Sequence, residues 1–327
     1  MRKVVVLSTG GTIATRGGLA HDDASALLER LPADPGVALD GKDVFCLGSY
    51  LLTPHDMRRV VHEVHAALTD PDVLGVVVTH GTDSMEETAF LAELFHDDPR
   101  PVVFTGAQRP ADNPDSDGPR NLADAIAVAA STPARDHGVL ITFDGRIFPA
   151  RGTRKAHTVA PAAFSAPDRG PIGHTRQGLV ELTATPARST PLVLADFALD
   201  GVRVDVVPCY PGTDTVALDA VTAAGSTGVV LEATGAGNAN PAVRDAVARL
   251  TADGVVVALS TRVHAGPIAE LYRNGGGIDL VEAGAVPVGD LRPSQARVLL
   301  TALLGCFRDP ARVARELRGR STSTERT

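Results

Sequence analysis

The chain has few cysteines, no tryptophan and almost no lysine. Its 327 residues include only three cysteines, Cys46, Cys209 and Cys306, which are widely spaced and odd in number. This spacing argues against a disulfide framework, and no C-x-x-C pair is present to suggest a zinc site or a redox centre. We therefore expect a cytoplasmic protein that holds no metal ion.

Long apolar runs are also missing. No run approaches the ~20 residues that a helix needs to cross a bilayer. The apolar strand pattern begins at residue 4, so we expect no signal peptide within this numbering. The net charge of −8 disfavours a nucleic-acid partner, because phosphate binding draws on clustered cations. The one basic stretch, from Arg308 to Arg326, is interrupted by acids and is interpreted as the solvated face of a last helix.

What the chain does contain is an alternation of β-like and helical segments. A chain of 327 residues, 44 % hydrophobic and 21 % charged, predicts two globular domains, and the alternation indicates α/β architecture. Thr53 as N-cap and Pro54 at the first helical position mark one helix start. In the first part, strands are predicted at 3–8, 43–47, 73–79, 101–105 and 138–143, helices at 54–68, 84–95 and 119–131, and short strands or hairpins at 146–165 and 178–183.

The pattern loosens near residue 184 and then restarts. We place a linker at 191–202, between a first domain at 1–190 and a second at 203–327. In the second domain, strands are predicted at 202–207, 227–232 and 254–259, helices at 213–223, 241–251, 294–305 and 309–319, and an irregular segment at 262–290.

Two short stretches carry most of the functional information. Residues 8–14 (STGGTIA) follow the apolar run 4–7, and residues 79–87 (THGTDSMEE) follow the apolar run 76–78. The carboxyl ends of strands are where ligands bind in an open α/β sheet. Each stretch brings a threonine, Thr12 or Thr82, to such an end, and Asp83 stands beside the second. Two hydroxyls and an acid predict nucleophilic chemistry on a small polar substrate.

Gly10 and Gly11 allow a tight turn and a close approach of the backbone to a ligand. The alternative is an ordinary turn between a strand and a loop. A phosphate-binding loop fits less well, because neither G-x-G-x-x-G nor G-x-x-x-x-G-K-[ST] occurs, and the segment 235–240 (GAGNAN) lacks the third glycine.

Asp83 has two interpretations. Its side chain could cap the helix that begins near Ser84, or its carboxylate could stay free to hold the ammonium group of a substrate while Thr82 faces the reacting carbon. His80, two residues earlier in the chain than Thr82, is interpreted as a structural side chain.

Lys155 is one of three lysines, with Lys3 and Lys42, among 31 cationic residues. An arginine stays protonated at any relevant pH, whereas a desolvated lysine can be neutral and accept a proton. Beside two threonines, Lys155 fits a Thr–Lys–acid relay in which the amine accepts a hydroxyl proton. The alternative is a solvated surface lysine.

Two metal-like patterns are set aside. Residues 113–124 mimic a calcium loop, but a proline stands at the second position and an aspartate at the last. His62 and His65 lie on one face of the predicted helix at 54–68, and no third ligand is evident near them.

Taken together, the motifs resemble the bacterial-type L-asparaginase family. The resemblance covers almost the whole chain and is carried, in family order, by residues 8–14, 79–88, 104–110 (FTGAQRP), 117–119 with Asn121, 237–240 (GNAN) and 291–297 (LRPSQAR). It implies two α/β domains, with a larger N-terminal domain built on a mostly parallel sheet and a smaller C-terminal Rossmann-like or flavodoxin-like domain. It also implies an intimate homodimer, commonly a homotetramer, whose active sites form between subunits.

The resemblance implies hydrolysis of the side-chain amide of L-asparagine to aspartate and ammonia, often with lesser activity on L-glutamine and with no cofactor. Thr12 would be the nucleophile and Thr82 the second threonine, with Lys155 as its proton partner. Asp83 would bind the α-ammonium group of the substrate, and Ser49 its α-carboxylate. The remaining implied substrate-binding residues are Gly11, Tyr50, Gly81, Ala107 and Asn240, the last supporting the site from the smaller domain.

The sequence departs from the family pattern in three places. We call residues 8–14 the first signature and residues 79–87 the second. The stretch 15–31 contains no tyrosine, although the family carries one on the mobile loop after the first signature. Tyr50 follows Ser49 where a glutamine is frequent, and it could narrow the pocket or supply a hydroxyl. The carboxylate often contributed by the neighbouring subunit has no clear counterpart, although Glu270 lies in the corresponding region.

Three hypotheses follow from these residues. The first is an L-asparaginase that works through a covalent acyl-threonine intermediate. The second is a related amidohydrolase, such as a glutaminase-asparaginase. The third is a weakly catalytic sensor of aspartate or asparagine, which the missing loop tyrosine suggests. We favour the hydrolase, because a sensor has no need of Thr82 and Lys155 together.

Overall fold

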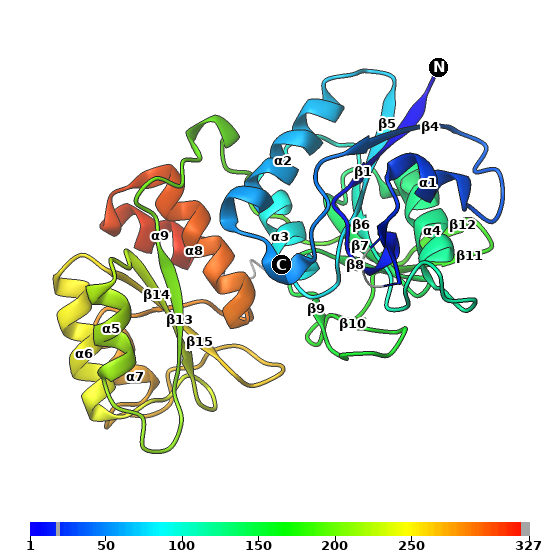
Figure 1. Cartoon of the computed structure of the whole chain (residues 1–327). Coiled ribbons are helices and arrows are strands. Elements are labelled where there is room, and N and C mark those ends of the chain that lie inside the picture. Colours follow the sequence, from blue (N-terminus) through cyan, green and yellow to red (C-terminus); the bar gives the residue numbers. More distant parts are fainter. Residues whose placement is uncertain (18–19, 322–327) are drawn as a thin grey trace. The chain divides into compact units, whose positions relative to one another are not determined.

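A computed structural model describes residues 1–17 and 20–321 and divides the chain into two compact units, Met1–Pro191 and Leu192–Thr327 (Figure 1). Each unit is a sheet covered by helices, so the predicted α/β class, with a larger and mostly parallel N-terminal sheet and a smaller second sheet, is confirmed. The more detailed domain bounds, with a linker at 191–202, stay a prediction.

The first unit is built on one sheet of eight strands in the order β12-β11-β8-β7-β6-β5-β1-β4. The five strands from β4 to β7 are parallel, and β8, β11 and β12 extend the sheet in antiparallel fashion. The bounds are β1 (Lys3–Ser8), β4 (Ala38–Asp43), β5 (Val73–Thr79), β6 (Val102–Thr105), β7 (Val139–Phe143), β8 (Arg146–Pro149), β11 (Gly173–Arg176) and β12 (Leu179–Leu182). Two small antiparallel pairs stand apart: β2 (Thr15–Arg16) with β3 (Ala20–His21), and β9 (Arg154–Lys155) with β10 (Phe164–Ser165).

Helices cover both faces of this sheet, α2 and α3 one face and α1 and α4 the other (Figure 1). The central strands are therefore buried on both sides, which explains why their sequences are continuous apolar runs rather than alternating ones. The bounds are α1 (Ala24–Glu29), α2 (Pro54–Leu68), α3 (Met85–Phe95) and α4 (Gly118–Ala130), with short 3-10 helices η1 (Thr12–Ala14), η2 (Ser49–Leu51) and η3 (Thr132–Ala134).

The second unit is a four-stranded parallel sheet in the order β13-β14-β15-β16. An apolar cluster joins this sheet to α5, α6 and α7, and α8 and α9 also pack against the strands of the sheet. The bounds are η4 (Leu194–Asp196), β13 (Val204–Pro208), α5 (Val216–Ala223), β14 (Gly228–Ala233), α6 (Pro241–Ala252), β15 (Val256–Thr261), α7 (Gly277–Glu282), β16 (Val286–Pro287), α8 (Pro293–Phe307) and α9 (Pro310–Ser321).

Two predictions of local structure were wrong. The strand expected at 43–47 lies at Ala38–Asp43, where it forms the exposed edge of the sheet. An edge strand with one solvated side shows little apolar pattern, so the true strand was hard to recognise. The apolar residues 44–47 lie beside the end of β1, where Val44 N donates a hydrogen bond to the Ser8 carbonyl (2.8 Å). The segment 262–290, expected to be irregular, contains α7 and β16.

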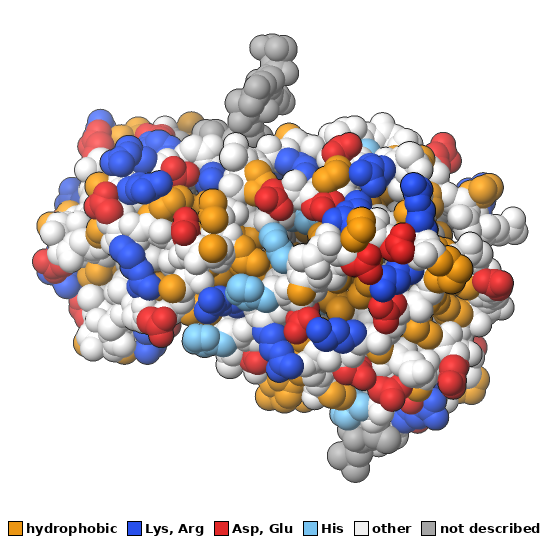
Figure 2. All heavy atoms as spheres, turned by 90° about the horizontal axis from the view of Figure 1, so that it is seen from above, with side chains coloured by type: hydrophobic (Ala, Val, Ile, Leu, Met, Phe, Trp, Pro, Cys, Tyr) orange, Lys and Arg blue, Asp and Glu red, His pale blue; other side chains and the backbone are white. Residues whose placement is uncertain are grey.

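The basic stretch near the end of the chain forms α9 as far as residue 321. Val313 and Leu317 are buried, while Arg312, Arg315 and Arg318 are exposed. This is the solvated helix face that the sequence predicts, and residues 322–327 lie outside the described part. Figure 2 shows basic and acidic side chains interspersed on the visible face rather than gathered by sign. Within residues 1–17 and 20–321, no helix has the length and apolar character needed to cross a membrane.

The start of α2 is a capping box. The Thr53 hydroxyl accepts a hydrogen bond from Asp56 N, and the Asp56 carboxylate accepts one from Thr53 N at 2.8 Å. Hydrogen bonding from the Thr53 hydroxyl and backbone lowers the pKa of Asp56, with the hydroxyl as the larger cause. Two donors at the helix start are thus satisfied by local partners.

Thr53→Ala should therefore lower the free energy of unfolding by about 1 kcal/mol, the usual cost of losing an N-cap hydroxyl. Urea unfolding followed by circular dichroism measures the change. Thr69→Ala is the matched control, because Thr69 donates its hydroxyl only to the Ala66 carbonyl, which already accepts from Thr69 N. Equal losses in the two variants would contradict a specific contribution of the capping box.

Since the folded state lowers the pKa of Asp56, the contribution of its carboxylate to stability is present at neutral pH and is lost as the pH falls through the folded pKa.

Candidate active site

The two signature stretches meet at the carboxyl edge of the first sheet. Thr9 donates both its backbone N–H (3.1 Å) and its hydroxyl (2.9 Å) to the Thr79 carbonyl, which ties the end of β1 to the end of β5. Thr12 follows three residues later as the first residue of η1 and is half-buried. No other described residue hydrogen-bonds to the Thr12 side chain, so its hydroxyl is not committed to the fold.

Gly10 and Gly11 are required by close backbone packing. Both have positive φ angles, 92° and 82°. A Cβ atom at Gly11 would lie 2.6 Å from the Cα atom of Gly81, and one at Gly10 would lie 2.7 Å from the backbone nitrogen of Leu47. Glycine at position 11 is therefore needed for the two signatures to touch, and glycine at position 10 is needed for the contact with Leu47. The turn is tight in the way the sequence predicts.

Lys155 meets Thr82 and Asp83 directly. Its Nζ atom donates to Thr82 Oγ1 at 2.8 Å and to Asp83 Oδ1 at 2.7 Å. Lys155 comes from β9, 73 residues from Thr82 in the chain, and its side chain is 17 % exposed. It is therefore not the solvated surface lysine that the sequence left as an alternative.

Asp83 does not cap α3. The N-cap of that helix is Ser84, which makes no side-chain cap bond, so the capping interpretation of Asp83 was wrong. The Asp83 carboxylate instead accepts from Lys155 and keeps 55 % of its side chain exposed. A half-exposed carboxylate beside an ammonium group remains available to a second cation.

Ser49 lies against the second signature. Its hydroxyl accepts a hydrogen bond from Asp83 N at 3.2 Å, and its carbonyl accepts one from the Ser84 hydroxyl at 2.7 Å. A Cβ atom at Gly81 would stand 2.6 Å from Ser49 Oγ, so this contact also requires glycine. The structure thus brings Gly11, Ser49, Gly81, Thr82, Asp83 and Lys155 into one continuous set of contacts.

Sequence reasoning gave no role to Gln108, which also belongs to this set. Thr82 donates its hydroxyl to Gln108 Oε1 at 3.0 Å, and Gln108 Nε2 donates to the carbonyls of Ala160 (3.2 Å) and Thr158 (3.3 Å). Two carbonyls on the amide nitrogen fix which way the amide points, so its oxygen must face Thr82. The signal was present, because Gln108 follows β6, the strand beside β5.

Glu86 was also missed. Its carboxylate accepts a hydrogen bond from Lys155 N and so attaches the start of α3 to β9. Glu86 lies inside the second signature, but no sequence pattern indicates that its partner comes from a strand far along the chain.

Two further predicted residues border this region in different ways. Ala107 is buried. It packs beside Gly118, where an added Cβ atom would lie 3.4 Å from the Cβ atom of Ala107. Tyr50 is 75 % exposed, and its ring covers Gly48, where a Cβ atom would lie 2.6 Å from ring atom Cε1. The phenol ring is therefore at the surface of the first unit rather than inside it.

Asn240 belongs to the second unit, where it caps α6. Its Oδ1 atom accepts from Val243 N at 3.0 Å, and its Nδ2 atom donates to the Thr213 carbonyl at 2.9 Å. Both ends of the amide are thus used within that unit, and the predicted role of Asn240 in substrate binding stays a prediction.

His80 and Asp117, near the site in the chain, both support the backbone. His80 is fully buried, desolvation lowers its pKa to about 4, and its Nδ1 atom lies 2.7 Å from the Gly81 carbonyl. It is therefore neutral near pH 7 and holds the backbone of the second signature. Asp117, in the calcium-like segment, accepts from the backbone N–H groups of Gln108 and Arg109. Among the described residues, no group of three His, Cys, Asp or Glu side chains is arranged to hold a metal ion.

The chain matches known proteins along almost its full length. Residues 3–188 match the family model "Asparaginase, N-terminal", and residues 203–317 match the "Glutaminase/Asparaginase C-terminal domain". The chain is 37 % identical to a "Probable L-asparaginase" of Deinococcus radiodurans (92 % of each chain covered) and 32 % identical to a "Probable L-asparaginase periplasmic" of Haemophilus influenzae (94 % of this chain, 90 % of the relative).

The same similarity holds in three dimensions. A crystal structure of the "Probable Cytoplasmic L-asparaginase" of Campylobacter jejuni superposes with a TM-score of 0.88 at 30 % identity, covering 97 % of this chain and 99 % of the other. Family models that together cover both units, relatives that span the chain and a shared fold agree with the two strand-end signatures. The chain belongs to the asparaginase family.

Proposed function

We propose that this protein is an L-asparaginase that hydrolyses L-asparagine to L-aspartate and ammonia. The observation that carries the proposal is the Lys155 ammonium, 2.8 Å from the Thr82 hydroxyl and 2.7 Å from the Asp83 carboxylate, at the sheet edge that also holds Thr12. An uncommitted hydroxyl beside a Thr–Lys–acid relay is the arrangement that acyl transfer from an amide requires. The relatives named L-asparaginase support the same reaction.

The reaction proceeds in two displacements. Thr12 Oγ1 attacks the amide carbon, a C–O bond forms, and backbone N–H groups near Thr82 stabilise the developing oxyanion. The C–N bond then breaks, the nitrogen takes up the proton that Thr12 Oγ1 gave up and leaves as ammonia, and the acyl group remains on Thr12 as an ester. Water attacks this ester: its oxygen bonds to the acyl carbon, the ester C–O bond to Thr12 breaks, and a proton from the water restores the Thr12 hydroxyl as aspartate is released.

Thr82 and Lys155 handle the protons of these steps. The Thr82 hydroxyl donates to Gln108 and accepts from Lys155, so it is linked at both ends to groups that fix its orientation. In its neutral form the Lys155 amine can take the Thr82 proton and return it later, which an arginine cannot do. The Asp83 carboxylate accepts a hydrogen bond from Lys155 Nζ and so holds the amine beside Thr82.

Substrate binding uses the polar groups around this relay. The exposed side of the Asp83 carboxylate pairs with the α-ammonium group of asparagine, and the Ser49 hydroxyl hydrogen-bonds to its α-carboxylate. Gly11, Gly81 and Ala107 leave room for the amino-acid body, because none carries a large side chain. We also assign Tyr50 and Asn240 to substrate binding.

A glutaminase-asparaginase is the main alternative, favoured by the family model that names both activities. An ammonia-release assay on L-asparagine, L-glutamine and their D-forms distinguishes the candidates. We expect turnover of L-asparagine to exceed that of L-glutamine. We expect little activity on the D-forms, because Asp83 and Ser49 bind the α-ammonium and α-carboxylate groups in the arrangement of one enantiomer. Faster release from L-glutamine would favour the alternative, and tight aspartate binding with no ammonia from either amide would favour the sensor hypothesis.

We further propose that the protein acts as a homodimer or homotetramer in the cytoplasm, without a cofactor. The three free cysteines and the relative named cytoplasmic support this location, although another relative is named periplasmic. Sedimentation equilibrium of the purified protein tests the assembly, and a monomer with full activity would overturn it. Cell fractionation tests the location, and recovery of the protein outside the cytoplasmic fraction would refute it.

A further inference from the structure

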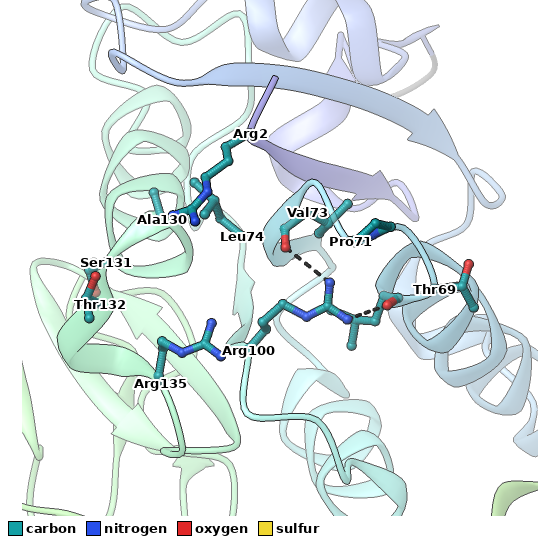
Figure 3. Close-up of a pocket in the computed structure, with 11 residues that line it drawn as sticks. Arg2, Thr69, Pro71, Val73, Leu74, Arg100, Ala130, Ser131, Thr132 and Arg135 are labelled. Atoms are coloured by element: carbon teal, nitrogen blue, oxygen red, sulfur yellow. Dashed lines mark hydrogen bonds between the residues drawn. The ribbon is translucent and has the colours of Figure 1, made fainter.

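The first unit has a cavity at the edge of its sheet opposite to the candidate active site. Arg2, Arg100 and Arg135 each stand shortly before a parallel strand: β1, β6 and β7, respectively. Because parallel strands all start at the same edge, these three side chains lie together at the amino ends of the strands. The cavity has a volume of about 600 Å³. It is lined by Arg2, Leu68, Thr69, Pro71, Val73, Leu74, Arg100, Ala130, Ser131, Thr132 and Arg135 (Figure 3).

The lining of this cavity is positively charged. The described residues that line it include three arginines and no carboxylate, in a protein whose net charge is −8. Figure 3 shows Arg2 reaching from the start of β1 to a place beside Ala130 and Leu74, while Arg135 points toward Arg100 from the other side. Like charges that converge on one hollow raise the local positive potential, which an anion would relieve.

Arg100 serves the fold. Its guanidinium donates to the carbonyls of Asp70 (2.9 Å), Val73 (3.1 Å) and Leu68, and it pairs with the Asp98 carboxylate. The hydrogen bonds that its guanidinium donates to the Asp98 carboxylate raise the pKa of Arg100. This side chain closes one wall of the cavity and has few donors left for a ligand.

Arg2 and Arg135 are different. Both are exposed, and neither makes a side-chain hydrogen bond or ion pair with any residue in 1–17 or 20–321. The acids nearest in sequence to the cavity residue Pro71 already have cations: Asp70 pairs with Lys3 at 3.1 Å, and Asp72 pairs with the N-terminal ammonium at 3.0 Å.

The carbonyls at the ends of the neighbouring helices do not need these arginines either. The Leu68 carbonyl, at the end of α2, accepts from Arg100. The Val128 carbonyl, near the end of α4, accepts from both the backbone N–H and the hydroxyl of Ser131. Capping of helix ends therefore does not account for the two uncommitted guanidinium groups.

We propose that Arg2 and Arg135 bind a small organic anion in this cavity. A carboxylate or phosphate would accept charge-assisted hydrogen bonds from the two guanidinium groups. The apolar side chains of Leu68, Val73 and Leu74 would cover the carbon part of the ligand. The volume, within the range of small-molecule sites, and this apolar floor favour an organic anion over an inorganic one. The site is separate from the catalytic edge and goes beyond the proposed hydrolase function.

Calorimetric titration of the full chain at low ionic strength tests this assignment with four probes: phenyl phosphate, benzoate, inorganic phosphate and phenol. We expect saturable binding of at least one aromatic anion, weaker binding of inorganic phosphate and none of phenol, since both charge and apolar contact are required. Whichever aromatic anion binds more tightly identifies the head group. Absence of saturable binding by both aromatic anions, or equal affinity for inorganic phosphate, would overturn the proposal.

A double variant locates the site. Arg2→Gln with Arg135→Gln should weaken binding of the aromatic anion by about tenfold or more, because two charged donors are lost. Arg176→Gln with Arg318→Gln is the matched control, since both arginines are exposed and the net charge changes equally. Unchanged affinity in the first pair, or an equal loss in the control, would refute the site. Ammonia release from asparagine should stay at the wild-type rate in both variants, so the result is independent of the proposed function.

Discussion

Thr12→Ala should abolish turnover of asparagine while leaving the fold intact. Loss of a single oxyanion donor typically costs about 10²–10³ in rate, and loss of the nucleophile removes the covalent route itself, so we expect a larger drop. The fold should persist because the half-buried Thr12 hydroxyl hydrogen-bonds to no other described residue. Ammonia release measures the activity, and thermal unfolding measures the stability.

Two companion measurements make this test specific. Thr12→Ser keeps a hydroxyl at the same place and should retain part of the activity. Thr9→Ala removes the hydroxyl bond to the Thr79 carbonyl, leaves the backbone bond, and should act mainly on stability. Mass spectrometry of rapidly quenched wild-type enzyme should find the acyl group on Thr12. Wild-type turnover in Thr12→Ala, or an adduct on another side chain, would reject the assignment of the nucleophile.

Lys155→Arg should reduce turnover by about 10²–10⁴-fold, the usual contribution of general acid–base catalysis. The substitution keeps the positive charge and a donor near Thr82 and Asp83. It removes the ability to accept a proton, because a guanidinium stays charged at any relevant pH. Lys155→Met, which removes the charge as well, should lose at least as much activity and should also weaken the alignment of Asp83.

Lys42→Arg is the matched control for this experiment. Lys42 pairs with Glu63 at the surface, at 2.6 Å, with 57 % of its side chain exposed. Exchange of one cation for another should matter little in such a pair, because exposed ion pairs contribute about 0–1 kcal/mol. If Lys155→Arg is as active as Lys42→Arg, Lys155 acts only through its charge, and the proton relay has to be abandoned.

The accuracy of the sequence predictions depended on how local their signals are. Helix α2 was predicted at 54–68 and is observed at Pro54–Leu68, because its capping residues and its apolar spacing lie within the helix and its first neighbours. Strand β4 was misplaced by several residues, because a polar edge strand of sequence ALDGKD is paired on one side only and shows no apolar pattern. Helix α7, six residues long and without a side-chain cap, gave too weak a signal to be found.

The candidate site was predictable where the strand-end rule applies. Thr12 and Thr82 each follow a buried parallel strand, so the sequence alone placed them at the same edge of one sheet. Lys155 was identified by composition, because a lysine is unusual in a chain whose cations are nearly all arginines. Its contact with Thr82 joins residues 73 positions apart and depends on the short β9–β10 pair. The spacing of apolar residues along the sequence does not predict such a contact.

By itself, the sequence determined the α/β class, the family and the two threonines at strand ends. Burial of a strand on both faces, and the turn that follows the strand, each depend on residues that are close together in the chain. The tertiary structure decided how the polar side chains are used. It assigned Asp83 to Lys155 instead of to a helix cap, placed Gln108 against Thr82, and left Arg2 and Arg135 facing a cavity without acids. Those outcomes depend on which segments meet across the sheet, and the free energy of such contacts depends on distance and burial rather than on order along the chain.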